Sequence, residues 1–172
     1  MEKATLPIVL GVTILAIATA GAIYVSNIQK SIKFTGRAGT EKSAVLYIWP
    51  IETKTAPGEE ASVNLSLTTE GEEVDKTQVQ ISWDPEIASL KAIQNGVTFN
   101  LYTNKEIDNE KGIASVQAKG IFSGAGTLAK LVFSGKKVGS TEISISNTAS
   151  KIINKTETNI LQGVNNGTLV VE

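Results

Sequence analysis

The groups of this chain that could do acid–base or metal chemistry are carboxylates, lysines and hydroxyls. There is no histidine and no cysteine among the 172 residues, so the commonest general base and the commonest transition-metal ligand are missing. Zinc sites, Ser-His-Asp triads and Cys-His dyads are therefore excluded by composition. No two carboxylates are placed in a way that indicates a hydrolytic cleft. The sequence predicts a protein without catalytic residues, which is not an enzyme.

The densest cluster of carboxylates falls in one predicted loop. It consists of Glu70, Glu72, Glu73 and Asp75. Carboxylate oxygens can hold Ca²⁺, but this spacing matches no EF-hand, and an acidic turn is usually only solvated. We therefore expect no metal site here and no cofactor.

The elements that position these residues are predicted to be strands. From Ala44 onward apolar and polar residues alternate with a period of two, which is typical of strands with one buried face. In the segment 77–83, for example, every second residue is apolar and the residues between them are polar. Glycine, proline and asparagine interrupt the pattern at intervals of roughly 8–12 residues, which favours a sandwich of two sheets. The sequence thus predicts an all-β domain over residues 44–172.

Five segments occur in a recognisable order along the domain. They are Pro57-Gly58, the stretch 79–90 with its Trp-Asp-Pro, Gly126-Thr-Leu-Ala-Lys-Leu-Val-Phe133, Gly139-Ser-Thr-Glu-Ile-Ser-Ile145 and Asn166-Gly-Thr-Leu-Val-Val171. In this order they resemble the cohesin family, over Val45 to Glu172. The resemblance implies a jelly-roll sandwich of about nine strands, as in the modules of cellulosome scaffolds and other surface proteins. It also implies non-catalytic protein–protein binding, for docking or scaffolding, with a dockerin-like or other surface protein as the partner.

Cohesins bind dockerin helices with one flat sheet face, so the resemblance implies a binding face and not a pocket. A polar, charge-poor face suits recognition by hydrogen bonds around a modest apolar centre, although an ordinary solvated sheet has the same appearance. Tyr102 is the expected main contact residue, because it offers area and a hydroxyl together. The predicted partner-binding face consists of Gln78, Gln80, Ser82, Asn100, Tyr102, Ser115, Gln117 and Lys119.

The first part of the chain is predicted to contain a membrane anchor. Residues 6–25 are twenty residues without a charge, which at about 1.5 Å per residue form a helix long enough for a hydrocarbon core of about 30 Å. We expect a transmembrane helix within residues 1–28 and a flexible basic linker over residues 29–43. Ala18-Thr19-Ala20 before Gly21 also fits a signal-peptide cleavage site, so a cleaved leader is the alternative.

Charge bears on the topology and on the class of partner. Residues 1–42 hold five basic and two acidic residues, while the whole chain has a net charge of −1, so the domain itself is acidic. An acidic domain does not suit nucleic acid, whose backbone needs a basic surface. The positive-inside rule would place the domain in the cytoplasm, whereas the resemblance implies surface display. We expect a single-pass protein of the cell membrane with an extracellular domain.

Two other functions are compatible with the same layout. An apolar N-terminal helix before a β-sandwich is also found in pilin-like filament subunits, and Lys3-Ala4 could be a processing point; Gly36 and Gly39 would, however, interrupt a long helical spine. Carbohydrate-binding modules related to cohesins usually contact polysaccharide through exposed aromatic residues. Aromatic residues make up only 5% of the chain, and Trp83 is predicted to be buried, which weakens that alternative.

Overall fold

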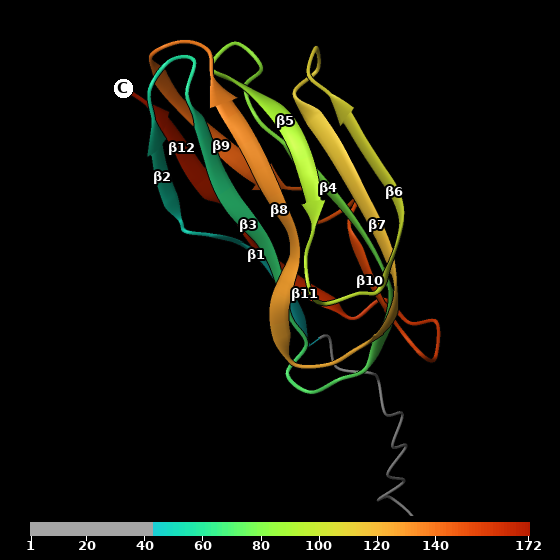
Figure 1. The fold of residues 1–172 in the computed structure, drawn as a ribbon. Helices are drawn as coiled ribbons and strands as arrows, with labels where there is room; N and C mark the ends of the chain where they lie inside the picture. Colours follow the sequence, from blue (N-terminus) through green and yellow to red (C-terminus); the bar gives the residue numbers. More distant parts are fainter. Residues whose placement is uncertain (1–42) are drawn as a thin grey trace, which may run out of the picture. The chain divides into compact units, whose positions relative to one another are not determined.

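The computed structural model describes residues 43–172, which form a sandwich of two β-sheets without a helix (Figure 1). This confirms the predicted all-β sandwich, whereas the predicted transmembrane helix and the linker up to residue 42 lie outside the described residues. The strands are β1 (Ala44–Trp49), β2 (Glu52–Thr55), β3 (Glu60–Thr68), β4 (Val74–Ser82), β5 (Ala88–Asn95), β6 (Leu101–Asp108), β7 (Ile113–Phe122), β8 (Ala125–Gly135), β9 (Gly139–Ile145), β10 (Lys151–Asn154), β11 (Leu161–Asn165) and β12 (Gly167–Val171).

No helix within residues 43–172 has the length and apolar character that crossing a membrane requires.

The number of strands in this part of the chain is twelve, and not about nine as predicted, because three strands are interrupted. β1 ends where Pro50 follows Trp49; proline has no N–H to donate to the ladder, and the chain crosses to the other sheet as β2. β11 and β12 likewise belong to different sheets, with Asn166 between them. β9 and β10 pair with successive parts of β4 and are separated by residues 146–150. Counting each interrupted strand once gives nine.

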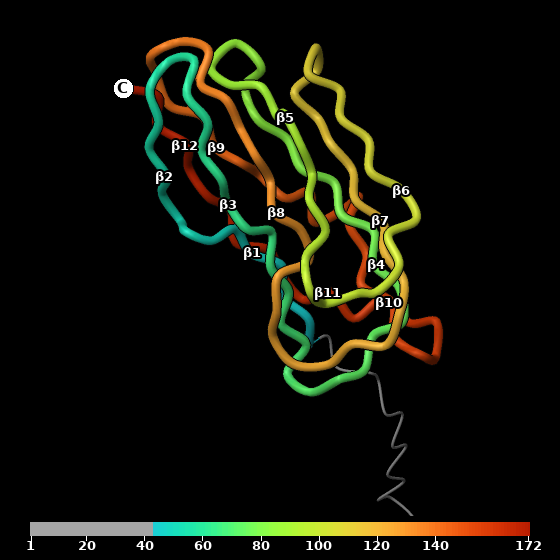
Figure 2. Tube along the Cα trace, in the orientation of Figure 1, coloured from blue at the N-terminus to red at the C-terminus, as the bar shows by residue number. Residues whose placement is uncertain are grey.

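The two sheets differ in size. One has the order β11-β1-β3-β8-β5, and the other has the order β2-β12-β9-β4-β7-β6, with β10 also paired to β4. β6 and β7 form a hairpin at one edge of the larger sheet (Figure 2). As an edge strand, β6 has a ladder partner on one side only, so its backbone is less constrained than that of β4 or β7.

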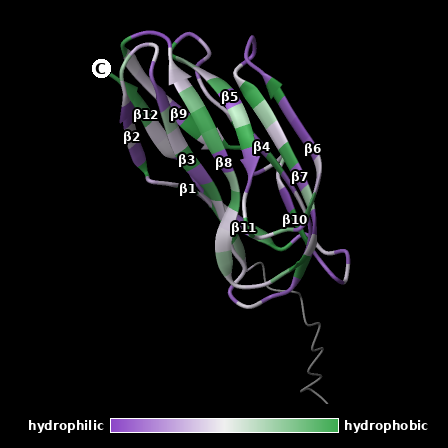
Figure 3. Ribbon diagram, viewed as in Figure 1, coloured by the Kyte–Doolittle hydropathy of each residue, from purple (hydrophilic) through white to green (hydrophobic). Residues whose placement is uncertain are grey.

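The core lies between the sheets, where strands such as β4 and β7 bury alternate residues. Figure 3 shows hydrophobic residues in strands of both sheets. Val79 of β4 and Phe133 of β8 are both completely buried. Burying a side chain of this kind contributes about 1.5–3 kcal/mol relative to leaving it exposed. Trp83 packs edge-on against Phe133 with ring centroids 5.5 Å apart, and its indole N–H donates to the Ala88 carbonyl at 3.1 Å. The prediction that Trp83 is buried is confirmed.

Candidate docking face

Six of the eight predicted residues lie on the outward surface of β4 and β7. In β4, Gln78 and Gln80 point outward while Val79 between them is buried. The antiparallel register of the two strands places Gln78 opposite Gln117 and Gln80 opposite Ser115. Neighbouring strands therefore bring together residues that are far apart in the sequence. The six are Gln78, Gln80, Ser82, Ser115, Gln117 and Lys119.

The predicted outward position of Tyr102 is wrong. Tyr102 lies opposite Ala118, which is only 1% exposed, and its ring packs against the core. Its hydroxyl accepts the Gly96 N–H at 2.9 Å and donates to the Leu128 carbonyl. Burial raises the pKa of the Tyr102 hydroxyl above its ordinary value. Tyr102 is thus a structural residue that joins β6 to the facing layer.

Asn100, the other residue of the predicted face, lies outside the strands. It is an exposed residue of the loop before β6. Its side-chain oxygen lies against Gly120. The φ of Gly120 is +132°, a conformation that glycine adopts readily and other residues rarely adopt. Asn100 therefore borders the end of β7 and is not part of the ladder of β6.

A bulge in β6 explains the inward position of Tyr102. The register shifts between Tyr102 and Asn104, and one extra residue reverses which side chains point outward. Leu101 faces outward opposite Lys119 before the bulge, and Asn104 lies opposite Gln117 after it. Figure 3 shows β6 mostly in the hydrophilic colour. The run Thr-Asn-Lys-Glu over residues 103–106 lacks apolar alternation, and this was the only sequence signal of an irregular edge strand.

Sequence reasoning therefore missed several residues of this surface. Glu106 lies opposite Ser115, and Asp108 lies opposite Ile113. On the other side of β4, Lys151 lies opposite Gln78 and Ile153 opposite Lys76. We call the whole surface the polar face. Its members are Lys76, Gln78, Gln80, Ser82, Leu101, Asn104, Glu106, Asp108, Ile113, Ser115, Gln117, Lys119, Ile121, Lys151 and Ile153.

Charge is distributed unevenly along the polar face. Lys76, Lys119 and Lys151 line a small hollow of about 170 Å³ at one end. Glu106 and Asp108 line a broader hollow of about 960 Å³ that extends from the centre to the other end. Glutamine amides and serine hydroxyls lie between the two ends. From Lys76 to Ser82 the strand spans about 20 Å, at about 3.3 Å per residue.

Some charged side chains of the polar face form ion pairs with neighbouring residues, and others do not. Lys76 pairs with Glu157 at 2.5 Å, and this hydrogen bond raises the pKa of Lys76 above its ordinary value. Asp108 accepts a hydrogen bond from Lys111 at 2.8 Å, which lowers the pKa of Asp108. Within the described range, neither Lys119 nor Lys151 forms an ion pair. These two lysines carry the positive charge that is open to a partner.

Comparison with known proteins identifies the fold and leaves the family unassigned by sequence. No sequence-family model matches the chain, and no curated protein matches it. Solved structures do match. The third cohesin of ScaC from Acetivibrio cellulolyticus, solved in complex with the ScaB dockerin, has a TM-score of 0.64 at 18% identity and covers 74% of this chain and 98% of its own. The domain has the cohesin fold.

Two further cohesins show how widely this fold is shared. The non-cellulosomal cohesin from Archaeoglobus fulgidus has a TM-score of 0.64 at 12% identity, over 76% of this chain and 91% of its own. A type II cohesin domain from the cellulosome of Acetivibrio cellulolyticus has a TM-score of 0.60 at 15% identity, over 74% and 95%. The resemblance that the sequence segments indicated is thus confirmed at the level of the fold.

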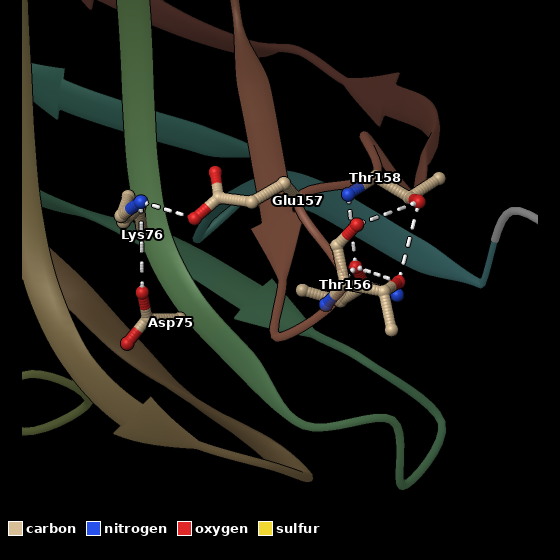
Figure 4. A network of polar contacts seen from close by, with 6 residues as sticks. Asp75, Lys76, Thr156, Glu157 and Thr158 are labelled. Carbon is tan, nitrogen blue, oxygen red and sulfur yellow. Dashed lines mark hydrogen bonds and ion pairs between the residues drawn. The ribbon is translucent and has the colours of Figure 1, made fainter.

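In this cohesin fold the acidic loop before β4 is tied to the turn after β10. The buried Asn154 side-chain oxygen accepts N–H bonds from Thr156 at 3.1 Å and Thr158 at 3.0 Å. The turn thereby presents Glu157 to Lys76, which also lies 3.9 Å from Asp75 (Figure 4).

Two other carboxylates of the loop have separate partners. Glu72 accepts a hydrogen bond from the Asn154 amide at 3.2 Å, and Glu73 pairs with Lys155 at 2.5 Å. Across residues 43–172 no three such side chains converge as metal ligands would. The acidic loop therefore fixes the β10–β11 turn beside the lysine end of the polar face.

Proposed function

We propose that this domain is a non-catalytic docking module that binds a helical protein partner on the polar face. The observation that carries the proposal is the continuous outward row of amides and hydroxyls on β4 and β7, flanked by opposite charges at the two ends. The fold supports it as well. The cohesins of ScaC and of OlpA were both solved in complexes with dockerins.

The polar face has the chemical parts that an interface needs. A protein interface combines polar groups with apolar area that binding buries. Leu101 is 54% exposed and Ile121 is 66% exposed, and both point outward near Lys119. These two side chains supply apolar area that a partner would bury. The amides of Gln78, Gln80 and Gln117 can each donate and accept hydrogen bonds.

The charge distribution favours one orientation of the partner. A helix of about 13 residues would match the face, since at about 1.5 Å per residue it is about 20 Å long. Its N-terminus carries partial positive charge and its C-terminus partial negative charge. The helix would therefore lie with its N-terminus over Glu106 and Asp108, and with its C-terminus over Lys119 and Lys151.

The proposal includes the place of the module in the cell. Residues 6–25 would tether it to the membrane as a single span, with the domain on the extracellular side. The uncharged run of twenty residues supports the tether, and the resemblance to surface-displayed modules supports the topology. Protease treatment of intact cells tests this: an external domain is removed, whereas a domain that survives and fractionates with the cytosol contradicts the proposal.

Site-specific photo-cross-linking tests the docking function. The full-length protein carries a photoreactive amino acid at Gln80, and the control protein carries it at Ser62, an exposed residue of β3 on the other sheet. We expect one discrete protein adduct on intact cells from the Gln80 position and none from Ser62. The adduct should disappear when Leu101→Ser and Lys119→Glu are added. Equal labelling from both positions, or no adduct at Gln80, contradicts the proposal.

A further inference from the structure

We propose that the outward surface of β1, β3 and β8 binds a neutral oligosaccharide. This surface belongs to the smaller sheet, whereas the polar face belongs to the larger one, so the inference is independent of the docking function. It rests on Tyr47 and Trp49. Leu46 and Ile48 of the same strand are buried, which places the two aromatic side chains next to each other on the outside of β1.

The two aromatic residues line a shared hollow. Residues two apart on a strand are about 6.6 Å apart, so the rings can contact successive units of an extended ligand. Trp49 is 57% exposed. With Asn64, Ser66 and Thr127, the rings line a shallow hollow of about 440 Å³.

Each ring has a hydrogen-bonding side chain beside it. Trp49 lies opposite Asn64, and Tyr47 lies opposite Ser66. Ser66 in turn lies opposite Thr127 on β8. Ser66 is only 5% exposed, so the groups open to a ligand are the two aromatic rings, the Asn64 amide and the Thr127 hydroxyl. The residues that line the hollow include no charged side chain.

This combination fits the chemistry of a sugar ring. A pyranose presents C–H groups on its flat faces and hydroxyls around its rim. The C–H groups carry partial positive charge and are attracted to the negative face of an aromatic ring. The hydroxyls can donate to and accept from amide and hydroxyl side chains. An ionic ligand would need a compensating charge, and none of the lining residues offers one. The exposed Lys130 lies opposite Asn64 but outside the lining of the hollow. The ligand class is therefore a neutral sugar chain.

The two tryptophans allow the binding to be measured directly. The chain contains only Trp49 and Trp83, and Trp83 is buried with its N–H bonded to the Ala88 carbonyl. A change in tryptophan emission on adding a sugar therefore reports on Trp49. The probes are hexasaccharides of β-1,4-glucose, β-1,3-glucose, β-1,4-mannose and α-1,4-glucose. The full-length protein is kept in a zwitterionic detergent, because detergents with sugar headgroups would compete.

We expect a saturable blue shift of emission with at least one hexasaccharide. Calorimetry should show that Trp49→Ala and Tyr47→Ala each weaken its binding about ten-fold or more, while Trp49→Phe retains part of the affinity. The matched control is Ile51→Ala, since Ile51 is exposed but does not line the hollow. Lys119→Glu on the polar face should leave sugar binding unchanged.

Two results would overturn the inference. One is the absence of binding to all four hexasaccharides. The other is equal binding by the wild-type and Trp49→Ala proteins. Neither result bears on the Gln80 cross-link, so the docking function stands or falls separately.

Discussion

Leu101 of β6 lies directly opposite Lys119 of β7, and both side chains point away from the core. An exposed leucine next to an unpaired lysine is an arrangement in which a partner can bury the apolar side chain and approach the charge. Ile121 is the diagonal neighbour of Leu101 on the same face, within the reach of about 7–8 Å that diagonal cross-strand pairs have. The lysine end of the polar face therefore combines apolar area with positive charge.

Replacing this exposed leucine should weaken docking and leave the fold intact. We expect Leu101→Ser to reduce the affinity for the partner recovered through the Gln80 cross-link by about 1–2 kcal/mol, as for an apolar contact residue that the partner buries. Calorimetric titration measures the change. Val138→Ser is the control, because Val138 is 64% exposed in the β8–β9 turn and away from the polar face. Similar losses in both variants would exclude a specific contact at Leu101.

Charge should govern how fast the partner associates. The association rate constant should fall as ionic strength rises, because screening weakens steering by exposed charges. Lys119→Glu should lower this rate at low salt and reduce its dependence on salt. Lys130→Glu is a matched control, since Lys130 is an exposed lysine of β8 on the other sheet. A rate constant that Lys130→Glu lowers as much as Lys119→Glu does would argue against steering by the polar face. Stopped-flow or surface-binding kinetics provide the measurement.

The buried hydroxyl of Tyr102 should matter for stability and not for binding. Tyr102→Phe removes a donor to the Leu128 carbonyl and an acceptor for the Gly96 N–H. We expect a loss of about 1–2 kcal/mol in the free energy of unfolding, measured by urea denaturation. Affinity for the partner should be unchanged. A large loss of affinity at unchanged stability would return Tyr102 to the set of contact residues.

Tyr102 also predicts a dependence of stability on pH. Its pKa is raised in the folded protein above the ordinary value of 10.0, so the unfolded chain loses this proton first. Stability is then fully present below about pH 10 and falls as the pH rises further. Other groups titrate in the same pH range. The Tyr102→Phe protein lacks this hydroxyl, so its stability changes with pH only through those other groups. The free energy of unfolding of the wild-type protein should exceed that of Tyr102→Phe below about pH 10, and the difference should shrink as the pH rises above 10. A difference that stays constant would contradict this.

Asn154 should be required for the turn that carries Glu157. Its side-chain oxygen accepts two backbone N–H groups and the Thr156 hydroxyl. Asn154→Ala would leave these donors without their partner, and we expect a loss of about 1–3 kcal/mol of stability. Asn154→Asp keeps an acceptor oxygen but loses the amide that donates to Glu72 at 3.2 Å. Both variants are therefore compared in a Glu72→Gln background, where Asn154→Asp should lose less. Equal stability of the two variants by urea denaturation would show that the acceptor is not what holds the turn.

The sequence predicted the fold and the central part of the polar face because residues 77–82 of β4 and 113–119 of β7 alternate without interruption. Apolar residues such as Val79 and Val116 are inward at every second position, so the outward partners follow from the period of two. The prediction failed on β6, where the bulge after Tyr102 changes the register. A bulge adds one residue without changing composition, so alternation cannot locate it.

The aromatic surface of β1 was not visible for a different reason. The segment 44–49 reads as a continuous apolar run, and such a run does not indicate which side chains face the core. Only the burial of Leu46 and Ile48 identifies Tyr47 and Trp49 as the outward pair. Similarly, the break at Pro50 indicates where β1 ends but not that the chain then joins the other sheet.

Amide hydrogen exchange of the full-length protein, alone and with the partner recovered through the Gln80 cross-link, tests the docking function most directly. The account predicts slower exchange in β6 (Leu101–Asp108) and β7 (Ile113–Phe122), and unchanged exchange in β3 (Glu60–Thr68) of the other sheet. Protection that appears in β3 and β8 while β6 and β7 exchange as before would contradict it.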